Sequence, residues 1–161
     1  MLYRMRNSLL GAAKGILIGA CLALAMTSQA AAESKMAGKK VIFVPITMGI
    51  SLTEAWARRM REHAATNGYT FEVKDAAFNT GAMAALIATA ISEKPDVLVV
   101  HNPTVQLLAR QIKQAEAAGI KVLQINLQSN QPSKAFVGAN WTQIGREIAE
   151  DIVKECGAGT N

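Results

Sequence analysis

Polar side chains follow directly after apolar, β-branched runs at several points of this 161-residue sequence. His101 and Asn102 come after Val97–Val100, and Asn126 and Gln128 stand at the end of the next such run. An amide side chain offers both an acceptor and donors, which are the groups that bind hydroxyls. The pattern therefore indicates a site for a small polar solute.

A second interpretation of Asn102 is that it caps a helix. Asparagine is favoured at the N-cap position, and Pro103 would then occupy the first position of the helix, which proline tolerates. A cap and a ligand-binding role can hold at once.

Catalytic and metal chemistry find little support in the sequence. His63 and His101 lack partners at metal-ligand spacing, and there is no nucleophile elbow or phosphate-binding glycine loop. Ser51 and His101 could suggest an exported hydrolase, but no acidic residue is placed to orient the histidine. We therefore expect no catalytic residue, no metal and no cofactor, and a protein that is not an enzyme.

The elements that must position these side chains alternate along the chain. Continuous apolar runs predict buried strands, strict alternation predicts an edge strand, and apolar residues three or four apart predict helices. The expected strands are 41–46, 69–74, 96–100, 121–127 and 135–138, and the expected helices are 52–67, 80–94, 104–118 and 144–156.

This alternation predicts the α/β fold class: a doubly wound parallel sheet of strand order 2-1-3-4-5, with helices on both faces. The continuous runs 41–46 and 97–100 belong in the middle of the sheet, and 69–74 belongs at its edge. Ligands bind such sheets beyond the carboxyl ends of the strands, where the strand order reverses. His101 and Asn102 would lie at that place.

The first 32 residues have the layout of a secretory signal peptide. Basic residues precede a short apolar segment, 15–26, and small residues lead to an expected cleavage after Ala32, with Ala30 as the nearest competitor. Ile18–Cys21 resembles a lipobox, so a lipoprotein anchored through Cys21 is the alternative, and an uncleaved anchor is a weaker one because the segment is short. We favour the soluble, exported form.

Charge and cysteine content exclude some classes of partner. Removal of residues 1–32 takes away three of the 17 basic residues and none of the 12 acidic ones, so the net charge becomes 14 minus 12, or +2. The lysines that remain are scattered, and we expect no nucleic-acid partner. Cys156 is then the one cysteine left, so no internal disulfide can form.

Several segments together carry a resemblance to a known family. They are VIFVPI, the helix SLTEAWARRMREHAATNGY, DVLVVHNPTVQLLARQIKQAEAAGIKVLQIN and FVGANWTQIGREIAEDIV. In order and spacing they resemble type 1 periplasmic binding proteins, in the branch that binds sugars for ABC transporters. The resemblance implies a first lobe over 41–157, preceded by a flexible leader, 33–40. Residues 158–161 would begin the crossover to a second lobe, which is missing here, so the chain appears truncated.

The resemblance also implies which residues bind the ligand. The loop after the first strand contributes Thr47 and Ser51, without an aromatic ring, and Asn126 with Leu127 replaces a pair that is often charged in the family. Asn140 stands where an aspartate often binds ligand, and Trp141 could stack on a sugar. The full set of expected ligand-binding residues is Thr47, Ser51, Asn102, Asn126, Gln128, Asn140 and Trp141. These amides and hydroxyls suit a neutral sugar or polyol.

The expected function is that of the substrate-binding component of an ABC sugar importer in the periplasm. Two lobes would close on the sugar and deliver it to a permease in the inner membrane. A periplasmic sensor that reports to a receptor would have the same fold and site, and an exported α/β hydrolase is a weaker alternative.

Overall fold

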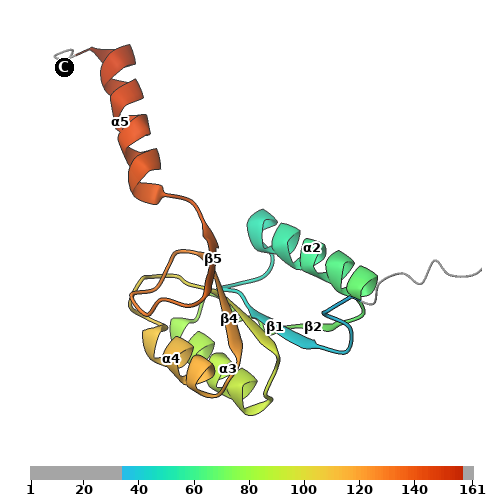
Figure 1. Cartoon of the computed structure of the whole chain (residues 1–161). Helices are drawn as coiled ribbons and strands as arrows, with labels where there is room; N and C mark the ends of the chain where they lie inside the picture. Colours follow the sequence, from blue (N-terminus) through green and yellow to red (C-terminus); the bar gives the residue numbers. More distant parts are fainter. Residues whose placement is uncertain (1–33, 158–161) are drawn as a thin grey trace, which may run out of the picture. The chain divides into compact units, whose positions relative to one another are not determined.

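The computed structural model describes residues 34–157, which form a five-stranded sheet and four helices (Figure 1). The predicted signal peptide, its cleavage site, Cys21 and residues 158–161 lie outside the described residues. The strands are β1 (Lys40–Val44), β2 (Thr70–Val73), β3 (Val97–His101), β4 (Lys121–Asn126) and β5 (Ala135–Gly138), and the helices are α2 (Ser51–Asn67), α3 (Thr80–Ser92), α4 (Ala109–Ala117) and α5 (Trp141–Cys156).

All neighbouring strands are parallel, in the order β2-β1-β3-β4-β5. This order confirms the sequence prediction. β3 lies between β1 and β4, and its four residues from Leu98 to His101 are buried, as a continuous apolar run requires. β2 lies at one edge, and its side chains are half-buried or exposed.

Successive residues of β1 point to opposite faces of the sheet and enter two separate cores. Ile42 and Val44 pack in the larger core, to which α3 and α4 contribute residues such as Met83 and Ile112. Val41 and Phe43 pack in the smaller core. Helices therefore cover both faces, as predicted, and this alternation is the ordinary two-residue period of a strand.

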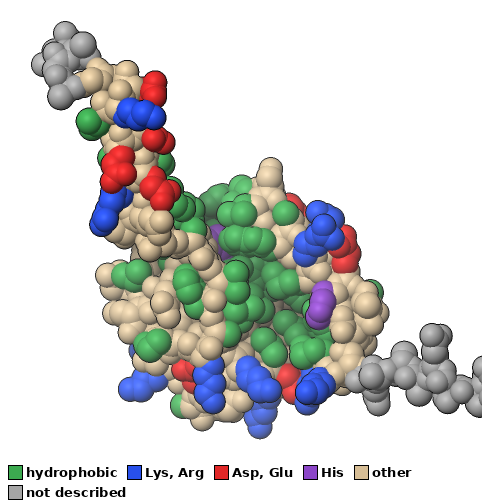
Figure 2. All heavy atoms as spheres, turned by 45° about the horizontal axis from the view of Figure 1, so that its top comes forward, with side chains coloured by type: hydrophobic (Ala, Val, Ile, Leu, Met, Phe, Trp, Pro, Cys, Tyr) green, Lys and Arg blue, Asp and Glu red, His purple; other side chains and the backbone are tan. Residues whose placement is uncertain are grey.

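The smaller core is covered by α2, which buries Ala57 and packs Trp56 and Met60 against it. Gly68 ends α2 with a left-handed φ of 70°, and its N–H bonds the Ala64 carbonyl oxygen. A left-handed residue at this position favours glycine, which explains the expected stop at Asn67-Gly68. Figure 2 shows hydrophobic side chains that remain open beside α2.

The third predicted helix, 104–118, starts later than expected. Residues 103–108 form bends and turns, and α4 begins at Ala109. The cause lies at Val105, whose carbonyl oxygen accepts hydrogen bonds from Ser129 Oγ, at 3.0 Å, and from Asn130 N, at 2.8 Å. These bonds take the place of the helical hydrogen bond that the Val105 carbonyl oxygen would otherwise accept, so Pro103 does not begin α4.

The last helix, α5, has no buried residue. Its apolar stripe includes Ile148, Ile152 and Val153, which are 54%, 56% and 61% exposed. The predicted helix 144–156 is therefore present, but its apolar side chains cover neither core. No helix within residues 34–157 is both long enough and apolar enough to cross a membrane.

Residues before β1 form a hydrogen-bonded turn. The N–H of Ala37 bonds the Ser34 carbonyl oxygen at 2.8 Å, and the N–H of Gly38 bonds the Gly68 carbonyl oxygen at 2.8 Å. The segment predicted as a leader is thus attached, through Gly38, to the turn between α2 and β2.

Candidate ligand-binding site

Because all five strands are parallel, their carboxyl ends meet at one edge of the sheet, where His101 ends β3 and Asn126 ends β4. The pairing of His101 with Ile125 places Asn126 next to the histidine, and the Asn126 amide nitrogen lies 3.2 Å from His101 Nε2. Two residues that are 25 positions apart thus form one polar contact at the predicted switch point.

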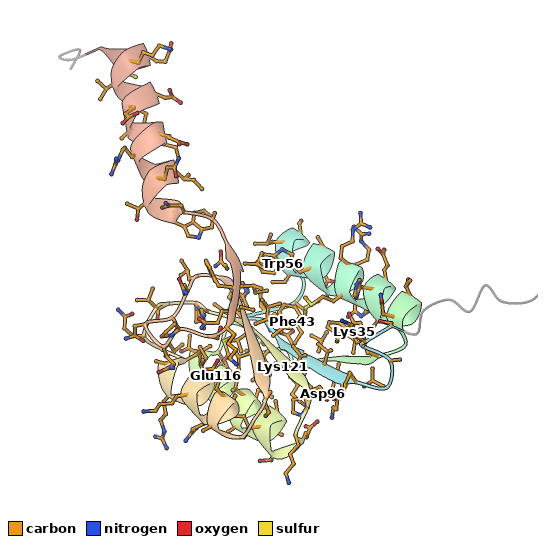
Figure 3. All side chains as sticks on the ribbon, in the orientation of Figure 1. Lys35, Phe43, Trp56, Asp96, Glu116 and Lys121 are labelled. Carbon is orange, nitrogen blue, oxygen red and sulfur yellow. The ribbon has the colours of Figure 1, made fainter. Side chains whose placement is uncertain are left out.

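His101 is a buried, neutral imidazole. The residue is 5% exposed, and its ring packs edge-to-face with that of Trp56 on α2, with ring centroids 5.2 Å apart and planes at 82°. Figure 3 shows Trp56 on α2, which lies above the sheet in that view. Burial lowers the pKa of His101, because the charged form would lose its hydration. Nε2 can therefore accept the Asn126 amide proton, while buried Nδ1 has no partner within residues 34–157.

Asn102 is fully buried in a network of amides. Its Nδ2 donates to Gln124 Oε1 at 2.7 Å and to the Leu127 carbonyl oxygen at 2.8 Å. The prediction that Asn102 caps the following helix is wrong, because α4 begins seven residues later along the chain, after the loop that Val105 holds. Both amide protons are used inside the protein, so Asn102 connects the ends of β3 and β4.

Gln124 completes this network and was missed by sequence reasoning. Its Oε1 also accepts from Ser129 N at 2.7 Å, and its Nε2 donates to the Gln131 carbonyl oxygen at 2.9 Å and to Ser133 Oγ at 3.0 Å. The sequence contained one indication, a glutamine inside the apolar run of β4, which a buried strand admits only when its amide is fully bonded. Gln124 thereby fixes the path of the β4–β5 loop.

The loop after β1 brings Thr47 and Ser51 to the same edge. Thr47 is buried and its hydroxyl donates to the Met48 carbonyl oxygen at 2.9 Å, while Ser51 is exposed at the start of α2. The Asp75 carboxylate accepts from the N–H of Met48 at 3.0 Å, and Glu54 accepts from the N–H of Gly49 at 3.0 Å. Both acidic groups near this loop are therefore bonded to main-chain amides.

Asn126 joins β4 to α5. It has a left-handed φ of 74°, which asparagine adopts more readily than most residues, and its carbonyl oxygen accepts the indole N–H of Trp141 at 3.2 Å. Asn140 Oδ1 accepts from the N–H of Gln143 at 3.0 Å and caps α5. Trp141 is 52% exposed, and Gln128 is exposed in the β4–β5 loop.

Phe78 is a second residue that the sequence did not single out. It lies in the β2–α3 loop, is 64% exposed, and follows Ala77 in a left-handed conformation, with φ values of 48° for Ala77 and 60° for Phe78. Such a conformation costs about 1 kcal/mol or more for a residue with a side chain. The N–H of Phe78 bonds the Ile46 carbonyl oxygen at 2.8 Å, which places this loop beside that of β1.

A hollow of about 330 Å³ lies at the opposite edge of the sheet, where the strands begin. Lys35, Lys39, Asp96 and Lys121 contribute to its lining, and Figure 3 labels three of them. Lys39 Nζ lies 3.0 Å from Asp96 Oδ1, and the N–H of Lys40 bonds the other carboxylate oxygen at 2.8 Å. Asp96 thus fastens the amino ends of β1 and β3.

The chemistry of the carboxyl edge is that of neutral hydrogen bonding. Hydroxyls, amides, a neutral imidazole and aromatic rings gather there, and the nearby carboxylates are occupied by main-chain donors. Among the described residues, no three His, Cys, Asp or Glu side chains lie together as a metal site would require.

Solved structures share this fold. A solute-binding protein of an ABC transporter from Agrobacterium vitis, with bound allitol, is 24% identical, with a TM-score of 0.70 over 76% of this chain and 42% of that one. A periplasmic ribose ABC transporter protein from Conexibacter woesei is 24% identical, with a TM-score of 0.66 and the same two coverages. A carbohydrate transporter from Acidothermus cellulolyticus, in complex with myo-inositol, is 24% identical, with a TM-score of 0.64 over 73% of this chain and 43% of that one.

The chain thus spans less than half the length of these solved structures, which fits one lobe of a two-lobe protein. A search among curated proteins gives no match. The family model described as periplasmic binding protein domain matches residues 13–161, which is most of the sequence. With the parallel sheet order and the polar carboxyl edge, this match shows that the chain belongs to the periplasmic binding protein family.

Proposed function

We propose that this chain is the substrate-binding component of an ABC importer for a neutral sugar or polyol. It would act in the periplasm, where it would bind the solute and deliver it to a permease in the inner membrane. The observation that carries the proposal is the contact between the neutral imidazole of His101 and the amide of Asn126, where the carboxyl ends of β3 and β4 meet.

Neutral groups favour a neutral ligand for a physical reason. A charged solute would lose its hydration on entering the site and would require a counter-charge there. Asp75 and Glu54, the acidic side chains of the neighbouring loop, already accept main-chain hydrogen bonds. Sugar hydroxyls instead exchange bonds to water for bonds to amides and hydroxyls, at little electrostatic cost.

The accessible members of the predicted set are the ones we propose as direct ligand contacts: Ser51, Asn126, Gln128, Asn140 and Trp141. Thr47 and Asn102 are buried, and we propose that they position the loops that carry these contacts. Trp141 follows Asn140 at the start of α5, so ligand contact there would reach the segment after β5.

The mechanism we propose is closure of two lobes around the solute. Contacts from both lobes would stabilise the closed state, which the permease would recognise, because a ligand shifts such an equilibrium only by binding one state better. The hydrogen bond from Trp141 to Asn126 ties the segment after β5 to the site, at 3.2 Å.

Ligand titration calorimetry tests this proposal on the purified chain. We expect heats of binding for at least one of allitol, L-rhamnose, myo-inositol and ribose, and none for L-glutamate as a charged control. Asn126→Gly keeps the left-handed backbone without strain but removes the amide, so it should weaken binding roughly tenfold while the chain stays folded.

Gln106→Ala is the matched control, because Gln106 is an exposed amide in the β3–α4 loop with no proposed contact. Its affinity should equal that of the wild type. Binding of glutamate in preference to all four neutral solutes would refute the proposal, as would full affinity in Asn126→Gly.

A further inference from the structure

The β2–α3 loop presents an aromatic ring to solvent beside the candidate site. Phe78 is 64% exposed and belongs to neither core cluster. Exposure alone does not indicate a function, since single apolar residues are common on protein surfaces. Two further features of Phe78 do indicate one: the conformation of its loop and the position of that loop at the carboxyl edge.

Hydrogen bonds hold Phe78 in its unusual conformation. Ala77 and Phe78 both have a left-handed φ, and neither is a glycine. The N–H of Phe78 bonds the Ile46 carbonyl oxygen, and Asp75 Oδ1 accepts from Ala77 N at 2.8 Å and Met48 N at 3.0 Å. A strained conformation that is fixed on both sides points to a use for the side chain it presents.

The position of Phe78 relative to the polar groups is also informative. Its main chain bonds Ile46, the residue before Thr47, so Phe78 lies beside the β1–α2 loop, which ends where α2 begins at Ser51. That loop contains no aromatic residue. Trp56 is engaged with His101, and Trp141 follows β5 at the other side of the sheet.

We propose that Phe78 is a stacking platform for the apolar C–H face of a ring-shaped sugar or cyclitol. The inference rests on the proposed function and deepens it by naming the class of ligand. A benzyl ring has a flat, weakly negative face that attracts C–H groups and excludes water. A pyranose or cyclitol presents such C–H groups on one side, whereas an open-chain polyol has no flat face to place on the ring.

Titration calorimetry with paired ligands tests the inference on the purified chain. L-Rhamnose and myo-inositol serve as ring ligands and allitol as the open-chain ligand. In Phe78→Ala, the Kd for the ring ligand that the wild type binds should rise about tenfold, and the Kd for allitol should change less than twofold. Phe78→Trp should restore ring binding, because it keeps an aromatic face.

Leu107→Ala is the matched control, since Leu107 is another exposed apolar side chain at this edge, 39% exposed in the β3–α4 loop. It should bind both ligand classes as the wild type does. Unchanged ring affinity in Phe78→Ala would overturn the platform and leave the proposed function standing, and so would an equal loss for both ligand classes. A wild type that binds neither these three ligands nor ribose would overturn the proposed function and the platform together.

Discussion

The side-chain amide nitrogen of Asn102 donates a hydrogen bond of 2.7 Å to the side-chain oxygen Oε1 of Gln124, and both side chains are fully buried. This bond joins the end of β3 to β4, and Gln124 passes the connection on to Ser129, Gln131 and Ser133 in the following loop. A buried network of this kind fixes the loop that carries Gln128. It also fixes the direction in which the chain leaves β4 at Asn126.

Asn102→Ala should lower the free energy of unfolding by about 2 kcal/mol, because it leaves a buried acceptor on Gln124 with one partner fewer and removes two hydrogen bonds. Urea unfolding, with an unchanged m-value, measures the effect. Gln106→Ala, on an exposed side chain of the next loop, should change the free energy by less than about 0.5 kcal/mol. Equal stability of the two variants would contradict the structural role assigned to Asn102.

His101 should make stability depend on pH. Because burial lowers its pKa, the unfolded chain binds a proton that the folded chain rejects. The contribution of His101 to the free energy of unfolding is therefore complete above pH 6.5, the ordinary pKa of histidine. It is lost as the pH falls from there through the lowered pKa.

Between about pH 7.5 and about pH 5.5, the free energy of unfolding measured in urea should fall less for His101→Gln than for the wild type. Gln106→Ala provides the control, since Gln106 is exposed and does not titrate, and it should follow the wild-type pH dependence. A wild-type stability that is flat across this interval would show that His101 is protonated as readily in the folded chain as in the unfolded one.

The sheet order could be predicted because each strand type has its own pattern. Val97–Val100 is apolar at every position and is a central strand, whereas 69–74 alternates and gives the edge strand β2. The side-chain network could not be predicted in the same way. Asn102 and Gln124 are 22 residues apart, and their hydrogen bond depends on strand register and loop path rather than on local preference.

The boundary of α4 shows the same limit. Local preference favours a helix from Pro103, but two hydrogen bonds to the Val105 carbonyl oxygen come from Ser129 and Asn130, far along the chain. Phe78 escaped notice because its exposure depends on the left-handed turn at Ala77, a position where the sequence has no glycine to indicate one.

Gly138 and Gly145, in β5 and α5, should respond in opposite ways to alanine. A Cβ at Gly138 would lie 2.5 Å from the Asn126 carbonyl oxygen and would also meet the Phe136 ring, whereas a Cβ at Gly145 would meet nothing within 4 Å. Gly138→Ala should therefore lower the melting temperature, with a loss of about 1–3 kcal/mol from the forced shift of β5 against β4.

Gly145→Ala should leave the melting temperature unchanged or raise it slightly, because alanine favours the helical conformation of α5 by about 1 kcal/mol relative to glycine. Differential scanning calorimetry of both variants measures the two effects side by side. A Gly138→Ala protein as stable as Gly145→Ala would mean that β5 does not approach Asn126 as closely as the structure shows.

The exposed stripe of α5 should make the chain associate with itself. Ile148, Ile152 and Val153 lie on a helix without a buried residue, and Figure 2 shows further hydrophobic side chains open beside α2. Apolar surfaces of this kind lower their free energy by leaving water. Sedimentation velocity should therefore show species larger than the monomer, in a proportion that rises with protein concentration.

Replacing both isoleucines of the stripe, in Ile148→Lys/Ile152→Lys, should shift the sedimentation profile towards the monomer, because a charged side chain on the stripe would have to lose its hydration on association. Glu147→Lys/Asp151→Lys is the matched control: it introduces the same two lysines at exposed polar positions of α5 and should continue to associate. If both double variants and the wild type sediment alike as monomers, the stripe is not an association surface. If the control dissociates as fully as the isoleucine variant, charge rather than apolar contact governs the association.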